Sequence, residues 1–515
     1  MGLNIDYSLY LVTGRNLLPP GKALQGGVTL VQVREKSADT GEILEVAQKT
    51  QAVCKKYNVP VLIDDRIDIA LAMGADGVHL GQTDMPIPIA RKLLPPGTIV
   101  GKTCNTVEQV RVAVEEGADY VGIGPVWGTQ TKKLTHPVAG PKGMAELLQP
   151  LEGTNVKAVA IAGINSENVL NCLWGSVTPS GHALDGVAVV SDIVASTEPK
   201  IAAQRLAAKI RAFYDLPFRT FSEAHTSLTT DGIKNSVGRI LTSIRKFGPL
   251  VHQITNTVVT TQSANATLAL GASPIMSTAP EEMADLGKVG GGLLVNFGTI
   301  QNIDGRQANI NRKPIVFDPV GVGASKFRKE SAAKLLNTWH ATVIKGNAGE
   351  LAALANSQEV QAKGVDSVGT GFANPGKFVR DLARERRCIV VLTGVTDWVS
   401  DGNVVVKLSN GHPLLGEITG SGCMVGTCVA TFCGAVSMAE AAARPADAAE
   451  DGKLARGDML LASVGGVLAL TVASEIAAKR SDVHGSGTFL PALIDELGKL
   501  TPEKIAETAN IEIIS

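Results

Sequence analysis

The hydrophobic pattern of the first 215 residues repeats eight times. Each repeat pairs a short run rich in Val and Ile with a stretch whose apolar residues recur at helical spacing. Eight such units in this length predict a (β/α)8 barrel, with a doubly wound sheet as the alternative. The expected strands lie near residues 6–12, 28–33, 59–63, 76–80, 98–102, 119–123, 156–162 and 184–190, and the expected helices include 42–57, 86–94, 106–116, 165–173 and 199–213.

A second α/β region follows a polar stretch without periodicity. Residues 216–232 have the composition of a linker, which places a domain boundary near residue 230. The pattern then predicts a hairpin at 398–407 and long helices over 422–442 and 452–478. Further strands are expected near residues 250–254, 292–297, 314–318, 341–345 and 388–393. We therefore expect two domains, 1–230 and 231–515.

Composition narrows the class of protein. The net charge is −1 and no long basic run occurs, which argues against a nucleic-acid or anionic-membrane surface. Residues 420–438 and 459–474 carry no charge, but both are rich in small residues and the second is too short to span a bilayer, so both are expected to be core helices. Seven cysteines without CxxC spacing disfavour disulfides and zinc, and the first residues do not read as a signal peptide. We expect a cytoplasmic enzyme acting on small molecules.

In a barrel of this kind, catalytic side chains lie at the carboxyl ends of the strands. Asp65 and Asp84 follow adjacent predicted strands and could share a hard divalent cation. Arg34, Lys36 and Lys132 supply cationic donors for phosphate oxygens. Taken singly, each group is typical of a solvated surface, so the prediction depends on their coincidence at successive strand ends.

A second phosphate site is predicted after the last barrel strands. Thr129, Thr131, Gly163 and Ser191 offer hydroxyls and close backbone approach, as phosphate sites in barrels do. We find no nucleophile paired with a base in this half. The pattern therefore predicts a site that holds two phosphorylated molecules and stabilises a leaving diphosphate.

The motifs QVREK, DDR, HLGQTD, GPVWGTQTKK, AIAGI and VVS, in this order, resemble those of thiamine phosphate synthase over essentially the whole first half. That family joins an aminopyrimidine-methyl diphosphate to thiazole phosphate and releases pyrophosphate. The resemblance implies magnesium at Asp65 and Asp84. It implies pyrimidine diphosphate contacts at Gln32, Arg34, Lys36, Asp64, Thr103 and Lys132. It implies thiazole phosphate contacts at Thr129, Gln130, Thr131, Gly163, Val190 and Ser191. Many members carry an amide where this chain has Asp64, and an ionised acid accepts hydrogen bonds but cannot donate one to phosphate.

In the second half, the stretch ITGSGCM (418–424) precedes a predicted long helix. The free N–H groups of a helix start, approached closely through glycines, form a hole for developing phosphate charge. Cys423 would lie in the first turn, where a helix N-terminus lowers the pKa of a thiol, and the thiolate could deprotonate an attacking alcohol. The alternative is a buried cysteine at a tight helix–strand crossing.

Other strand ends favour phosphoryl transfer. Asp318 and Glu350 could support magnesium, and Thr393 ends a third strand. Asn256, Val258 and Met276 suit a small, partly apolar ligand, although Met276 alone would be expected in the core.

This set resembles hydroxyethylthiazole kinase, of the ribokinase-like group, over nearly the whole second half. The resemblance implies that Met276 and Gly420 contact the thiazole alcohol, that Arg328 and Thr393 contact ATP together with Asp318 and Glu350, and that Cys423 accepts the proton. It also implies a homo-oligomer built on a trimeric kinase domain. The two halves resemble a fused, fungal-type thiamine biosynthetic enzyme whose second half makes what its first half consumes. Three alternatives stay open: one half is an inactive scaffold, the protein is a ligand sensor, or the substrates differ.

Overall fold

The chain forms two compact units. The computed structural model describes residues 5–14, 21–131, 133–216, 221–222, 228–300, 305–363, 366–368 and 371–514. Unit 1 comprises Met1–Pro217 with Ala449–Gly452, and unit 2 comprises Phe218–Ala448 with Lys453–Ser515. The division thus lies at the start of the predicted linker, not near residue 230. The end of that linker is helical, because α10 (Thr230–Phe247) begins inside it.

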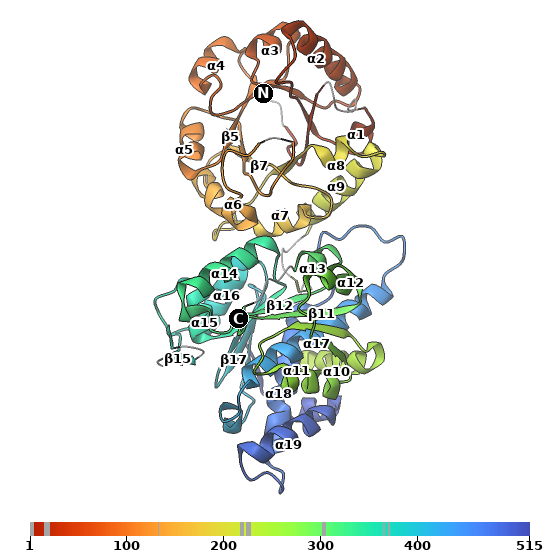
Figure 1. The fold of residues 1–515 in the computed structure, drawn as a ribbon, viewed down its shortest axis with the longest axis vertical. Coiled ribbons are helices and arrows are strands. Elements are labelled where there is room, and N and C mark those ends of the chain that lie inside the picture. The colour runs from red at the N-terminus through yellow and green to blue at the C-terminus, as the bar shows by residue number, and fades with distance from the viewer. Residues whose placement is uncertain are drawn as a thin grey trace. The chain divides into compact units, whose positions relative to one another are not determined.

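Unit 1 is a closed barrel of eight parallel strands, as the hydrophobic pattern predicts (Figure 1). Pairing of β1 with β8 closes the barrel, with Leu9 opposite Val187. All eight predicted strands are present, displaced by a few residues at their ends. They are β1 Leu9–Thr13, β2 Leu30–Val33, β3 Val61–Asp64, β4 Gly77–Leu80, β5 Ile99–Cys104, β6 Tyr120–Ile123, β7 Lys157–Ala160 and β8 Gly186–Val189.

Helices surround this barrel (Figure 1). The sequence predicts some of these helices and misses others, and length alone does not separate the two groups, since two predicted helices have seven residues and one missed helix has nine. The predicted helices are α2 Thr40–Lys55, α4 Ile87–Leu93, α5 Val107–Glu115, α7 Val169–Gly175 and α9 Pro199–Tyr214. The others are α1 Gly21–Gln25, α3 Ile67–Met73, α6 Gly140–Leu148 and α8 Ser191–Val194.

Unit 2 is built on a nine-stranded sheet of order β10-β9-β11-β12-β13-β16-β17-β18-β19. The first six strands run parallel, and the last three pair antiparallel. The predicted strands and hairpin are β9 Leu250–Ile254, β11 Gly291–Asn296, β12 Ile315–Asp318, β13 Val343–Asn347, β16 Ile389–Thr393, β17 Asp397–Ser400 and β18 Val405–Leu408. The edge strands β10 Ser273–Ile275 and β19 Ile511–Ile514, and the small pair β14 Gln361–Lys363 and β15 Asp366–Val368, were not predicted.

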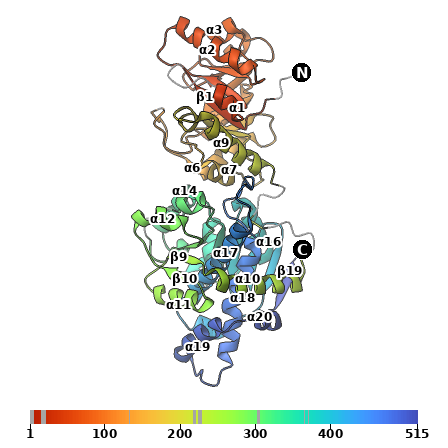
Figure 2. The same ribbon diagram turned by 90° about the vertical axis from the view of Figure 1, so that its right-hand side faces the viewer.

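Helices flank this sheet (Figure 2). They are α11 Thr260–Leu270, α12 Met283–Lys288, α13 Arg306–Ile310, α14 Lys326–Thr338, α15 Ala348–Leu354, α16 Pro375–Arg386, α19 Ser486–Gly498 and α20 Pro502–Thr508, with the two longest described next.

Two helices of unit 2 are long and apolar enough to cross a membrane: α17 (Ser421–Ala443) and α18 (Met459–Ala478). Inside the fold, 72% and 89% of their apolar windows are buried, as expected of core helices. Helix α18 begins at Met459 and not at residue 452, because the Asp458 side chain accepts the N–H of Leu461 and caps the helix there.

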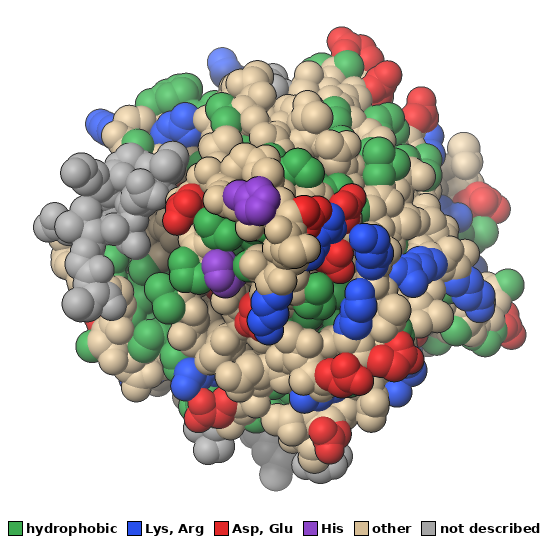
Figure 3. Space-filling model, turned by 90° about the horizontal axis from the view of Figure 1, so that it is seen from below, with side chains coloured by type: hydrophobic (Ala, Val, Ile, Leu, Met, Phe, Trp, Pro, Cys, Tyr) green, Lys and Arg blue, Asp and Glu red, His purple; other side chains and the backbone are tan. Residues whose placement is uncertain are grey.

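On the face shown in Figure 3, Lys and Arg side chains lie among Asp and Glu side chains. This mixture agrees with the net charge of −1.

Candidate active sites

The barrel site lies where β2 to β5 end. Strand register places Gln32 beside Leu62, and Asp64 beside His79. Gln32 and Asp64 are only 4% and 7% exposed, so both are held by the barrel rather than by solvent. Because all the strands of a closed parallel sheet run in the same direction, these side chains lie at one end of the barrel.

Lys36 links the two adjacent carboxylates of the DDR motif. Its Nζ lies 2.7 Å from Asp64 Oδ2 and 2.5 Å from Asp65 Oδ2, and Arg34 Nε lies 3.6 Å from Asp64. Burial alone would lower the pKa of Lys36, but its bonds to Asp64 and Asp65 raise it. Asp65 adopts a left-handed backbone with φ of 55°, which is uncommon for a residue other than glycine. The Asp64 carboxyl group therefore lies between the cationic side chains of Arg34 and Lys36.

A divalent cation fits the chemistry of the acidic pair. Among the described residues, no group of three or more His, Cys, Asp and Glu side chains is gathered as a metal cage. Magnesium needs none, because it is commonly held by one or two carboxylates, substrate phosphates and water. The Lys36 ammonium already lies against Asp65, so a metal ion there would share this carboxylate with Lys36. Asp84 Oδ2 accepts the Gly81 N–H at 2.6 Å, which fixes its orientation. Asp65 and Asp84 are thus suitable ligands.

A buried hydrogen-bond chain crosses the barrel beneath this site. Gln32 Nε2 donates to Tyr10 OH at 2.6 Å, and Tyr10 OH lies 2.9 Å from Tyr120 OH. Tyr120 OH lies 2.7 Å from His79 Nδ1, and His79 Nε2 lies 2.7 Å from Thr103 Oγ1. Sequence reasoning missed Tyr10 and Tyr120, because a tyrosine in an apolar strand has the same pattern as a core aromatic.

The residues predicted to hold the second phosphate include two loops that pack closely through their backbones. Gly163 has φ of 72°, and a Cβ there would lie 2.6 Å from the carbonyl oxygen of Gly128. The loop that carries Thr129, Gln130 and Thr131 therefore approaches Gly163 closely, and Thr131 N–H donates to Thr129 Oγ1.

The remaining residues of this site lie after β8. Val190 precedes helix α8, and Ser191 is the first residue of that helix. Asp192 accepts the Ser166 N–H at 2.9 Å, which ties the loops after β7 and β8 together. Lys132 lies outside the described residues.

In unit 2, Asp318 lies at the end of β12 and is fully buried. Lys345 Nζ lies 3.2 and 3.3 Å from its two carboxylate oxygens, and Asn296 Nδ2 donates to it at 2.9 Å. Burial opposes the charge of Lys345, but Asp318 and Glu350 outweigh it and raise the pKa of Lys345. The sequence prediction missed Lys345 and Asn296, although both are polar residues near the ends of apolar strands.

The Glu350 carboxyl group accepts hydrogen bonds from two backbone N–H groups and also acts on nearby charges. It forms a capping box with Asn347 at the start of α15, and its Oε1 accepts the Gly321 N–H at 3.0 Å. Burial raises the pKa of Glu350 to about 7, and nearby Asp318 acts in the same direction. Asp397, also missed, is 4% exposed, and burial raises its pKa to about 7.

Cys423 lies in the first turn of α17, as predicted, and is 9% exposed. Asn256 Nδ2 lies 3.6 Å from its Sγ and also donates to Asn296 Oδ1 at 2.8 Å, which joins the thiol to the Asp318 cluster. The expectation that Cys423 is a thiolate is wrong. Burial and then the Asp318 charge raise the pKa of the thiol, and the opposite effect of Lys345 does not offset them.

The other predicted kinase residues differ in backbone conformation and in exposure to solvent. Gly420 has φ of 82° and would clash with Val259 if it carried a Cβ, so the turn before α17 requires glycine. Val258 is 62% exposed beside it, whereas Met276 and Thr393 are partly buried.

Arg328, for which an ATP contact is predicted, forms hydrogen bonds within the protein. Its guanidinium donates to the carbonyl oxygens of Phe297, Gly298 and Val320. In this structure it therefore braces the loops after β11 and β12.

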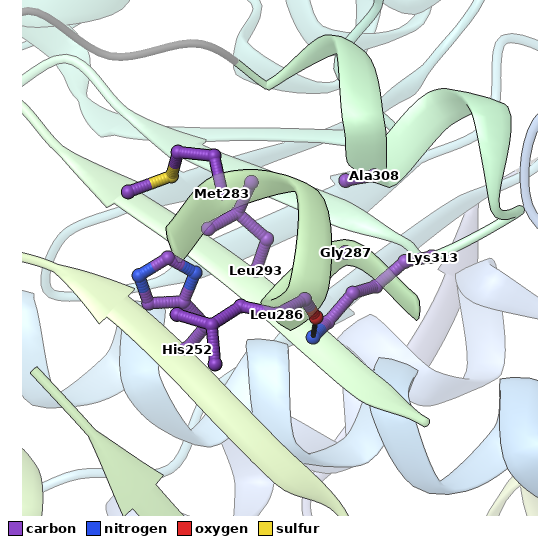
Figure 4. Close-up of a pocket in the computed structure, with 7 residues that line it drawn as sticks. All are labelled: His252, Met283, Leu286, Gly287, Leu293, Ala308 and Lys313. Atoms are coloured by element: carbon purple, nitrogen blue, oxygen red, sulfur yellow. Dashed lines mark hydrogen bonds between the residues drawn. The ribbon is translucent and has the colours of Figure 1, made fainter. Parts of the chain in front are cut away.

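A small cavity of about 10 Å³ lies elsewhere in unit 2 (Figure 4). It has the size of one water, which is too small for either substrate. Lys313 reaches into it and donates to the Leu286 carbonyl oxygen at 2.9 Å, and burial lowers its pKa to about 8. The other lining residues are His252, Met283, Leu286, Gly287, Leu293 and Ala308.

Comparison with known proteins gives a match in each unit. The thiamine monophosphate synthase family matches residues 9–193, and the hydroxyethylthiazole kinase family matches residues 241–503. A probable thiamine biosynthetic bifunctional enzyme from Schizosaccharomyces pombe is 38% identical and covers 98% of this chain and 97% of its own. A thiamine biosynthetic bifunctional enzyme from Saccharomyces cerevisiae is 37% identical with the same coverage. A hydroxyethylthiazole kinase from Histophilus somni is 40% identical over 53% of this chain and 98% of its own.

Proposed function

Because the chain belongs to the family of thiamine biosynthetic bifunctional enzymes, we propose that it catalyses two consecutive reactions. Unit 2 phosphorylates 4-methyl-5-(2-hydroxyethyl)thiazole with ATP. Unit 1 joins the resulting thiazole phosphate to 4-amino-2-methyl-5-(diphosphooxymethyl)pyrimidine, giving thiamine phosphate and pyrophosphate. The observation that carries the proposal is the pair of family matches, one to each unit and in the order that the sequence motifs predict.

In unit 1 the reaction breaks the bond between the pyrimidine methylene carbon and the diphosphate oxygen. The thiazole nitrogen then forms a bond to that carbon, so no protein nucleophile is needed. Arg34 and Lys36 donate to the departing diphosphate, and Asp64 keeps them at the site through its ion pairs. Magnesium held by Asp65 and Asp84 would supply further positive charge to the leaving group.

In unit 2 the alcohol oxygen attacks the terminal phosphorus of ATP, the bond from that phosphorus to the bridging oxygen breaks and ADP leaves, and the thiolate of Cys423 takes the proton of the alcohol. The N–H groups at the start of α17 lie beside Cys423 and stabilise negative charge on the transferred group. Burial and Asp318 raise the pKa of Cys423, and Lys345 and the amide of Asn256 act against them, so the thiol must release its own proton before it can accept that of the alcohol. Magnesium near Asp318 and Glu350 would neutralise phosphate charge, as kinases require.

We further propose that the enzyme is cytoplasmic and assembles as a homo-oligomer built on a trimeric kinase domain. The composition supports the first statement, and the resemblance to trimeric kinases supports the second. Light scattering on the purified chain tests the assembly, and a monomer would contradict it.

A paired product assay tests the two activities. One tube contains thiazole alcohol, ATP, magnesium and pyrimidine diphosphate, and the other replaces alcohol and ATP with thiazole phosphate. Thiamine phosphate in both tubes supports two active sites. Product only in the second tube would contradict the kinase assignment and favour a scaffold, a sensor or a kinase for another alcohol. Product in neither would contradict the proposal for unit 1.

A further inference from the structure

We infer that Tyr10, Tyr120 and His79 are positioning residues that set the hydrogen-bonding direction of Gln32 and Thr103 together. This inference rests on the proposed synthase function of unit 1. The five side chains come from five different strands, β1, β2, β4, β5 and β6, and their polar atoms form one continuous chain with links of 2.6 to 2.9 Å.

The chain is enclosed by the barrel. Tyr120 is fully buried, Tyr10 is 2% exposed and His79 is 8% exposed. Burial raises the pKa of both tyrosines well above the usual range, so each hydroxyl keeps its proton. Because a hydroxyl has one proton, each tyrosine donates in one link of the chain and accepts in the other.

These constraints couple the two ends of the chain. The Gln32 amide N–H donates to Tyr10, so Tyr10 donates to Tyr120 and Tyr120 donates to His79 Nδ1. His79 then carries its proton on Nε2 and donates to Thr103 Oγ1. This leaves the Gln32 carbonyl oxygen as an acceptor and the Thr103 O–H as a donor. Reversing either end would reverse every link between them.

The acceptor at Gln32 and the donor at Thr103 match the substrate of the proposed reaction. A carbonyl acceptor at Gln32 pairs with the exocyclic amine of an aminopyrimidine and disfavours an oxo group at that position. A hydroxyl donor at Thr103 pairs with diphosphate oxygen. We therefore assign to the chain the discrimination between amino- and oxopyrimidine diphosphates.

A remote tautomer change tests the coupling directly. In the full-length chain labelled with ¹⁵N-histidine, with His79 identified by comparison with His79→Gln, we expect a proton on Nε2 and none on Nδ1. A glutamate at position 32 can only accept, so Gln32→Glu should reverse the chain and place a proton on Nδ1. Protonated Nδ1 in the unsubstituted protein, or no change at His79 in Gln32→Glu, would overturn the inference.

Kinetics test the consequence for specificity. Tyr120→Phe removes the central hydroxyl and keeps the ring. Its preference in kcat/KM for amino- over oxopyrimidine diphosphate should fall about tenfold or more, with KM for the aminopyrimidine rising by a similar factor.

Tyr7→Phe is the matched control. Its ring packs 5.1 Å from that of Tyr120, but its hydroxyl is not part of the chain. It should leave the preference unchanged. Kinase activity of the same chain should be unchanged in both variants. An unchanged preference in folded Tyr120→Phe would overturn the inference.

Failure of the proposed function gives a different result. If the unsubstituted protein forms no thiamine phosphate, the synthase assignment fails. The tautomer measurement would still decide whether the chain couples Gln32 to Thr103.

Discussion

The two units bury polar groups in different ways. Unit 1 buries hydroxyl, amide and imidazole groups in a chain through the barrel, and its cationic Lys36 side chain stays 42% exposed at the rim. Unit 2 buries both partners of an ion pair, with Lys345 and Asp318 exposed by only 4% and 0%. The difference follows the chemistry that we propose. A displacement without a protein base needs oriented dipoles and surface cations, whereas proton removal by Cys423 needs a charged environment that controls its pKa.

The largest expected effect comes from a substitution in the acidic pair of unit 1, Asp65 and Asp84. Asp84→Ala should lower thiamine phosphate formation by at least about 1,000-fold, because metal stabilisation of a leaving diphosphate contributes several kcal/mol. The kinase activity of the same chain should be unchanged. Measurement of both activities over a magnesium titration checks this. Asp68→Ala, at an exposed acid that pairs with Arg66, is the control and should have little effect. Near-normal coupling by Asp84→Ala at saturating magnesium would reject the metal assignment.

The next largest effect concerns the buried charge of unit 2. Lys345→Met leaves Asp318 buried without its cation and should lower the free energy of unfolding of unit 2 by about 3–5 kcal/mol. Urea unfolding followed by circular dichroism measures this, while synthase activity reports on unit 1.

Lys407→Met is the control for this prediction, because the ion pair of Lys407 with Glu512 is exposed and should contribute less than about 1 kcal/mol. Equal effects of the two substitutions would show that burial of the Lys345 ion pair has no special importance.

A smaller effect is expected when the Cys423 thiol is replaced, and it tests the role of that thiol in the kinase reaction. Cys423→Ser should lower kcat of the kinase about 100-fold, within the range for loss of a general base. Because burial raises the pKa of Cys423, kcat of the unsubstituted enzyme should increase with pH between about 7 and 9, and the serine variant should lose this increase. Cys428→Ser, in the same helix and fully buried, should retain the pH profile. A flat profile in the unsubstituted enzyme would argue against proton transfer to Cys423.

The smallest effect is the pH dependence of stability. Burial raises the pKa of Asp397 from 3.8 to about 7, so folded unit 2 keeps a proton that the unfolded chain releases. Its contribution therefore makes the free energy of unfolding fall as pH rises from about 4 to 7 and leaves it level above that. Asp397→Asn keeps an acceptor for Gly394 N–H and should make this decrease shallower. Urea midpoints between pH 5 and 7.5 measure the slope, and an identical slope in both proteins would contradict the prediction.

Strand positions could be predicted because each is a short apolar run between polar stretches. The edge strands β10 and β19 could not, since three or four half-exposed residues give no clear pattern. The start of α18 was placed too early because helix ends depend on capping contacts such as that of Asp458.

The site was predicted less completely than the fold. Charged residues that follow apolar runs indicated Asp64 and Asp318 at strand ends and Glu350 in the first turn of a helix after a strand. Tyr10 and Tyr120 were missed because sequence alone cannot show that two hydroxyls face each other across a barrel. The ionisation of Cys423 was predicted wrongly because a helix start is visible in sequence, whereas burial beside Asp318 is not.

The position of Gly101 under Tyr120 has a consequence for sequence change in this barrel. A Cβ at position 101 would lie 2.1 Å from the Tyr120 ring, so a larger residue there requires the ring to leave its place. Positions 101 and 120 are therefore expected to vary only as a pair. A library randomised at both should yield folded combinations of a small and a large residue, whereas single replacements of Gly101 should be eliminated.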